Sequence, residues 1–212
     1  MLMTLAACGG GDGVLPNQPP TPQIQDSGNE SPAPGETPEL SAETTGGSLE
    51  VYFTYDKQSG WASNQFALWL EDADGNYVET LYATRYTANG GYKNRPESLS
   101  LWVGKSGLAD KEKPDVDAVT SATPNPGELV FYKDFADLPG GEYRFVLEGS
   151  LRWNNRVVYS GTFNTAEIGG KTAIKADFEH FFEACDNHGE LTAESPEIEM
   201  LSGVRAYFTP ST

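Results

Sequence analysis

Large apolar residues occupy every second position in several short runs of this chain. In the first run these are Leu49, Val51, Phe53 and Tyr55. A period of two is typical of a β-strand with one buried face. Runs of the same kind predict further strands at Gln65 to Glu71, Tyr77 to Tyr82, Ser98 to Val103, Glu128 to Lys133, Glu142 to Arg152, Asn155 to Phe163 and Glu197 to Thr209.

The segment from Lys171 to Cys185 fits two patterns. Ile174, Ala176 and Phe178 alternate as in a strand, whereas Ile174, Phe178 and Phe182 recur at a spacing that suits a helix. We expect a strand that runs into a short helical turn.

The segment Asp72-Ala73-Asp74-Gly75-Asn76 separates two of the expected strands. Gly75 is suited to the positive φ angle of a tight hairpin turn. The two aspartates also resemble part of a calcium-binding loop, but such a loop needs its glycine further along and a terminal glutamate. The pattern therefore favours a turn.

Many short strands with turn residues about every ten positions predict an all-β protein, an antiparallel β-sandwich. The 212 residues suffice for one domain of this kind. We expect it to span residues 48–212.

Residues 9–47 have a different composition. They are rich in Gly, Pro, Ser, Thr, Asn, Gln and Glu and contain almost no large apolar residue. Such a segment cannot bury enough apolar surface to offset the entropy lost on ordering. We expect a disordered tether.

Cys8 follows Leu5-Ala6-Ala7 and precedes three glycines. This resembles the lipobox of bacterial lipoproteins, which implies that residues 1–8 end a signal peptide and that Cys8 carries the lipid. No basic n-region and only a short apolar segment precede it, so we expect the true signal peptide to begin upstream. The resemblance implies an extracytoplasmic protein anchored to a bacterial membrane.

The net charge of -17 comes from 31 acidic and 14 basic residues. This charge repels phosphate backbones, so nucleic acid is not an expected partner. The simplest interpretation of the acidic residues is a solvated surface.

Several residues have side chains suited to chemistry. Asp117, Thr120 and Thr123 lie in a Pro- and Asp-rich stretch between expected strands, where hydroxyls and a carboxylate can also simply cap a turn. His180, Cys185 and His188 include metal-ligand types, but their spacing matches no known motif and a lone Cys beside aromatics is typically a small buried residue. We expect no metal site and no catalytic residues.

Five motifs occur in a characteristic order along the chain: Phe66 to Asp72, Asp74 to Leu81, Leu99 to Trp102, Asp117 to Thr123, and Pro139 to Tyr143 with Leu147-Glu148. Taken together, they resemble a bacterial family of predicted periplasmic proteins known as domain of unknown function 2271. The family is similar to immunoglobulin-like domains such as that of the flagellar hook scaffold protein, which implies an immunoglobulin-like sandwich. Its members occur beside flavin transferases and membrane redox proteins. This chain has Phe131 to Asp134 where the family usually has a Trp-Asp pair.

The stretch from Asp117 to Thr123 also resembles the Asp-x-x-Ser/Thr-Gly-Ala-Thr motif of periplasmic flavin carriers. Asp117, Thr120, Ala122 and Thr123 match by position, and Ser121 stands where Gly is usual. The resemblance implies that a flavin transferase could join FMN (flavin mononucleotide) through its phosphate to Thr123.

Three functions remain open at this level. The sequence favours a lipid-anchored extracytoplasmic binding or scaffold module without catalysis and without a cofactor, because this needs only the fold, the tether and the anchor. The alternative is an electron-transfer carrier with FMN at Thr123, served by a flavin transferase or a membrane redox protein. The third is a carbohydrate-binding surface module, whose Trp or Tyr residues would stack on sugar rings unless they fill the core.

Overall fold

The structure is a computed structural model that describes residues 44–59, 63–110, 119–121, 123–152, 155–181 and 199–211. These residues fall within one structural unit, Ser41–Thr212. The expected signal peptide and nearly all of the expected tether lie outside the described residues.

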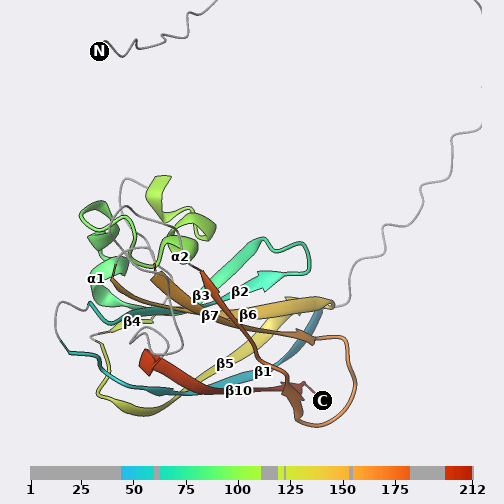
Figure 1. The fold of residues 1–212 in the computed structure, drawn as a ribbon. Helices are drawn as coiled ribbons and strands as arrows, with labels where there is room; N and C mark the ends of the chain where they lie inside the picture. The colour runs from blue at the N-terminus through green and yellow to red at the C-terminus, as the bar shows by residue number, and fades with distance from the viewer. Residues whose placement is uncertain are drawn as a thin grey trace, which may run out of the picture. The chain divides into compact units, whose positions relative to one another are not determined.

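The described strands form two sheets (Figure 1). The four-stranded sheet has the order β5-β1-β10-β8 and consists of β5 (Gly127–Pro139), β1 (Thr44–Tyr55), β10 (Leu201–Pro210) and β8 (Thr172–Ile174). The six-stranded sheet has the order β4-β3-β2-β6-β7-β9 and consists of β4 (Val119–Ser121), β3 (Tyr77–Thr84), β2 (Gln65–Asp72), β6 (Glu142–Arg152), β7 (Asn155–Asn164) and β9 (Asp177–Phe181). All described pairs are antiparallel except β3 with β4, which is parallel.

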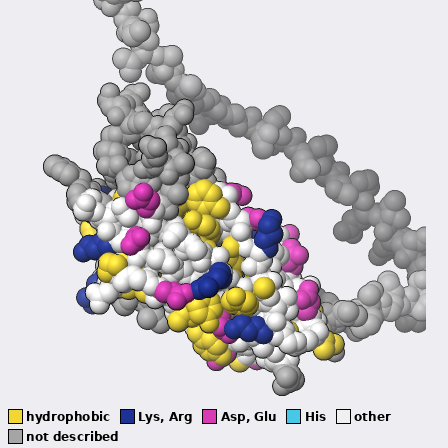
Figure 2. Space-filling model, turned by 60° about the horizontal axis from the view of Figure 1, so that its bottom comes forward, with side chains coloured by type: hydrophobic (Ala, Val, Ile, Leu, Met, Phe, Trp, Pro, Cys, Tyr) yellow, Lys and Arg dark blue, Asp and Glu magenta, His cyan; other side chains and the backbone are white. Residues whose placement is uncertain are grey.

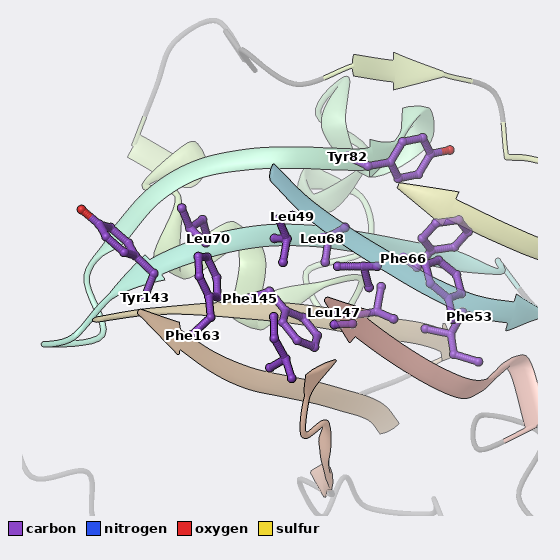
Figure 3. Packing of buried hydrophobic residues seen from close by; sticks show 14 of the residues in the cluster. Leu49, Phe53, Phe66, Leu68, Leu70, Tyr82, Tyr143, Phe145, Leu147 and Phe163 are labelled. Atoms are coloured by element: carbon purple, nitrogen blue, oxygen red, sulfur yellow. The ribbon is translucent and has the colours of Figure 1, made fainter. Parts of the chain in front are cut away.

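The main hydrophobic core lies between the two sheets. Alternate residues of β1 point inward and meet alternate residues of β2 and β6, as Figure 3 shows for Leu49, Phe53, Phe66, Leu68 and Phe145. All five are at most 1% exposed. The predicted antiparallel β-sandwich is therefore confirmed.

The other face of the six-stranded sheet is also buried. The chain between β3 and β4 includes α1 (Arg85–Ala88), the 3-10 helix η1 (Gly91–Lys93), α2 (Ser100–Lys105) and the 3-10 helix η2 (Leu108–Asp110). We call residues 85–110 the helical insert; Figure 1 shows its helices in green beside β2 and β3. Trp69 of β2 and Trp102 of α2 are fully buried in the second hydrophobic cluster, which contains residues of both the insert and the sheet.

The predicted strand from Ser98 to Val103 is wrong, because the chain there forms α2. Leu99 has left-handed backbone angles of φ 53° and ψ 44° immediately before the helix. Trp102 and Val103 are buried against the sheet, whereas Leu101 is only half-buried. An apolar run of this length satisfies both a strand and a helix, and its period cannot choose between them.

Most other expected strands are confirmed, with changes at their ends. Strand β6 has the expected bounds, β1 begins earlier at Thr44, and β5 continues to Pro139. The last strand begins at Leu201 because residues 199 and 200 are helical. The segment from Lys171 contains two strands, β8 and β9, and its expected helical turn lies outside the described residues.

The expected hairpin turn between β2 and β3 is confirmed. Gly75 has a φ of 77°, and its N–H donates to Asp72 O at 3.0 Å. The Asp72 carboxylate accepts from the backbone N–H groups of Asp74 and Asn76 at 3.0 and 2.8 Å. These bonds hold the turn and lower the pKa of Asp72, the hydrogen bond from the Asn76 side chain being the largest cause.

Candidate functional site

Strand β4 carries the described part of the motif that resembles a flavin attachment site. It is the terminal strand of the six-stranded sheet and pairs in parallel with β3, with Ala83 opposite Thr120 and Thr84 opposite Ser121. Thr123 follows two residues after the strand and is exposed. Thr123 is therefore open to solvent.

The motif's four candidate residues are only partly described. Thr120 lies on β4 and Thr123 just beyond it, while Asp117 and Ala122 lie outside the described residues. Ser121, which replaces the usual Gly, pairs as an ordinary strand residue. An extended backbone does not require Gly, so the strand can form with Ser at this position.

Buried hydroxyl groups tie the end of β3 to α1 and the segment that follows. Gln65 Oε1 accepts hydrogen bonds from Thr84 Oγ1 at 2.7 Å and from Thr87 Oγ1 at 3.3 Å. Thr87 Oγ1 also lies 3.0 Å from Ser98 Oγ. Because all four residues are buried, this network fixes α1 at the end of the sheet near β4.

Glu148 of β6 is a fully buried carboxylate beneath α2. It accepts hydrogen bonds from the backbone N–H groups of Trp102 at 2.8 Å and Leu101 at 3.2 Å. Arg156 Nε lies 3.8 Å from Glu148 Oε1. Burial raises the pKa of Glu148 to about 7, although the N–H groups and Arg156 favour its charged form. Glu148 thus anchors the helical insert to the sheet.

Glu71 of β2 is a second buried carboxylate, 1% exposed. It accepts hydrogen bonds from Trp69 Nε1 at 3.0 Å and Arg144 at 2.5 Å, and Lys105 Nζ lies 3.5 Å away. Burial by itself would raise its pKa, but the hydrogen bonds and the two cations outweigh burial and lower it. A polar cleft of about 450 Å³ beside the β2–β3 turn is lined by Lys105 and Arg144 together with acidic residues.

The outer face of the four-stranded sheet carries one exposed tyrosine, Tyr132, beside an exposed valine and two half-buried tyrosines. We call Tyr52, Tyr132, Tyr207 and Val130 the tyrosine face. Glu50 pairs with Tyr132 on one side and Tyr207 on the other, so the three lie in one row across β5, β1 and β10. Figure 2 brings the lower side of Figure 1 forward and shows hydrophobic side chains among basic and acidic ones.

Cations cover part of the tyrosine face. Lys171 Nζ lies 4.6 Å from the centroid of the Tyr207 ring, and Arg205 lies 5.7 Å from that of Tyr52. Both are also paired with carboxylates, Lys171 with Glu50 and Arg205 with Glu128. The face therefore presents rings within a nearly balanced set of charges.

Most of the other candidates from the sequence fall outside the described residues. His180 lies on β9, while Cys185, His188, Trp61 and Trp153 lie outside the described residues. Among the residues the structure describes, no group of three or more His, Cys, Asp or Glu side chains could hold a metal ion. Trp69 and Trp102 are buried, so they fill the core and cannot stack on a sugar.

These features define a two-sheet β-sandwich with a helical insert on one face and an exposed threonine beyond a terminal strand. Comparison with family models shows the family of the chain. It belongs to the family described as predicted periplasmic protein (DUF2271), whose model matches residues 48–180. No curated protein and no solved structure matches the chain.

The family description is that of an extracytoplasmic protein. Within the described parts of the chain, none of the helices has the length and apolar character needed to cross a membrane. The family match covers most of the strands and the whole helical insert.

Proposed function

We propose that this protein is an extracytoplasmic electron carrier with FMN attached to Thr123. The exposure of Thr123 directly after the terminal strand β4 is the observation that carries the proposal. A transferase needs access to the acceptor hydroxyl, and a redox partner needs access to the attached flavin. The position of Thr123 meets both needs.

The attachment is a phosphoryl transfer. Thr123 Oγ forms a phosphodiester bond to the FMN phosphorus of a flavin adenine dinucleotide donor, and the pyrophosphate bond of that donor breaks. Adenosine monophosphate leaves, and the hydroxyl proton passes to a base of the transferase. When attached, FMN supplies the redox chemistry, while the protein supplies its position and its electrostatic surroundings.

The location proposed for the carrier follows the family description and the motif at Cys8. A lipid on Cys8 would hold the domain at a membrane, and residues 9–47 would let it reach its partners. The partners under this proposal are a flavin transferase and a membrane redox protein.

Replacing Thr123 with valine is expected to abolish attachment of flavin, because valine has the same shape but lacks the hydroxyl. The full chain would be exported in cells together with a flavin transferase, and its intact mass and peptide map recorded. The wild type should gain the mass of one FMN less one water on the peptide that contains Thr123. Thr123→Ser, which retains a hydroxyl, is the matched control and should still be modified.

Two results would contradict the flavin proposal. One is an unmodified wild-type chain beside a known carrier that is modified in the same cells. The other is a Thr123→Val protein that still gains flavin, since the acceptor would then be a different residue.

The tyrosine face supports a second candidate, a binding module without catalysis. An aromatic ring that stays exposed on a sheet is suited to binding, and Tyr132 is 60% exposed between the half-buried Tyr52 and Tyr207. The nearly balanced charges around these rings favour an uncharged, hydroxyl-rich ligand such as a glycan over an anion, which the net charge of -17 repels.

Binding of the full chain to a glycan panel tests this second candidate. If the tyrosine face binds sugars, Tyr132→Ala should weaken binding roughly tenfold or more, as expected for a central aromatic contact. Phe178→Ala is the control, because Phe178 is 41% exposed but lies on β9 of the other sheet. If Tyr132→Ala and Phe178→Ala both bind glycans as tightly as the wild type, the tyrosine face is not the binding surface.

A further inference from the structure

The helical insert presents an exposed aromatic residue and an arginine near the end of β4. Tyr86 of α1 is 41% exposed, and the Arg95 guanidinium lies 5.6 Å from the centroid of its ring. We infer that Tyr86 and Arg95 form a docking site for the flavin on Thr123, with Tyr86 against the ring system and Arg95 near the phosphate. This inference rests on the proposed attachment of flavin.

The parallel pairing of β3 and β4 brings the two sites to the same end of the sheet. Thr84 lies opposite Ser121, and the chain then continues to Tyr86 on one side and Thr123 on the other. Tyr86 is two residues beyond Thr84, and Thr123 is two residues beyond Ser121. The Cα atom of Tyr86 therefore lies within about 8 Å of that of Thr84, and the Cα atom of Thr123 within about 8 Å of that of Ser121. Adjacent strands are about 4.8 Å apart, and α1 contacts β4 directly.

The ring of Tyr86 is held in place by close packing. Gly91 lies beside it, and a Cβ atom at Gly91 would come within 2.5 Å of a carbon of the Tyr86 ring. Gly91 is therefore needed at this position. Because the network around Thr87 also fixes α1, the ring can present a preformed stacking surface.

The segment of sequence that contains Tyr86 is basic, unlike the chain as a whole. Residues 81–96 contain Arg85, Lys93 and Arg95 and no acidic residue, whereas the whole chain carries a net charge of -17. All three basic residues are exposed. A phosphodiester keeps one negative charge, and arginine pairs with phosphate through its planar guanidinium group. The local charge therefore suits the phosphate that attachment at Thr123 would place there.

Flavin fluorescence on the modified full-length protein tests the docking site separately from attachment. Tyr86→Leu should leave the mass of the adduct unchanged but raise flavin fluorescence several-fold and lower its anisotropy, because a stacked tyrosine quenches and immobilises the flavin. Tyr86→Phe should keep the anisotropy high while losing quenching, since a phenyl ring stacks but is a poor electron donor. Arg95→Gln should lower the anisotropy and make it less dependent on salt.

The controls separate the possible failures. Phe178→Leu changes an exposed aromatic residue on β9, at the opposite edge of the six-stranded sheet from β4, and should match the wild type in mass, fluorescence and anisotropy. If the adduct forms on all variants and Tyr86→Leu has wild-type fluorescence and anisotropy, the docking site is wrong while the proposed attachment stands. If the wild type carries no adduct, the attachment and the docking site that rests on it are both overturned.

Discussion

Replacing Trp102 with alanine is expected to lower the free energy of unfolding by about 3 to 5 kcal/mol. Trp102 is fully buried between α2 and the six-stranded sheet, and its Nε1 donates to Thr80 Oγ1 at 2.9 Å. The truncation leaves a cavity where the helical insert meets β2 and leaves the Thr80 hydroxyl without this donor. Urea unfolding of the full chain, followed by circular dichroism, measures the loss.

Trp102→Phe separates the two parts of this effect. It keeps an aromatic ring in the cavity but removes the hydrogen bond to Thr80, so the expected loss is smaller, about 1 to 2 kcal/mol. A loss below about 1 kcal/mol for Trp102→Ala would contradict the prediction. It would mean that the insert adds little to the stability of the sandwich.

The contribution of Glu148 to the free energy of unfolding is expected to fall by about 3 kcal/mol between pH 4.5 and pH 7. The folded-state pKa of Glu148 is about 7, against an ordinary value of 4.5, because burial disfavours its charged form. Between these two values the folded state holds a proton that the unfolded state has lost. The contribution is therefore fully present below pH 4.5 and is lost as pH rises to about 7.

Glu148→Gln is the matched variant for this measurement. Glutamine keeps the shape and one oxygen acceptor but does not titrate, so its stability should be flatter than that of the wild type across this pH range. Glu71 has a lowered pKa, and its stabilising contribution is instead lost as pH falls below about 4.5, outside the window. Parallel curves for the two proteins from pH 4.5 to 7 would show that Glu148 does not control this dependence.

The strands of the sandwich were predictable because their pattern is local. Alternation at β1 specifies its one buried face, and alternate apolar residues of β2 and β6 mark the face toward the main core. Gly75 marks the turn between β2 and β3 by its positive φ angle. The same rule failed for α2, because the run from Ser98 to Val103 satisfies two periods. There the tertiary contacts of Trp102 and the hydrogen bonds that Glu148 accepts from the backbone of α2 favour the helix.

The candidate site was only partly visible in the sequence. The motif predicts Thr123 as a candidate acceptor, and residues 81–96, which contain three basic and no acidic residues, carry a further signal. Tyr86 and Arg95 lie far from Thr123 along the chain, and only the pairing of β3 with β4 brings their segments to one end of the sheet. Glu148 carried no clear signal, because β6 also contains Glu142, Arg144 and Arg152.

By itself, the sequence determined the all-β class, most strand positions, the acidic character of the chain and its family, because these depend on composition and on spacing within short segments. The tertiary structure decided that β2 is buried on both faces, that α2 is a helix, that Thr123 is exposed, and that Glu148 is buried with a raised pKa. The physical reason is that burial and pairing depend on segments distant in the chain, whose contacts no local pattern contains.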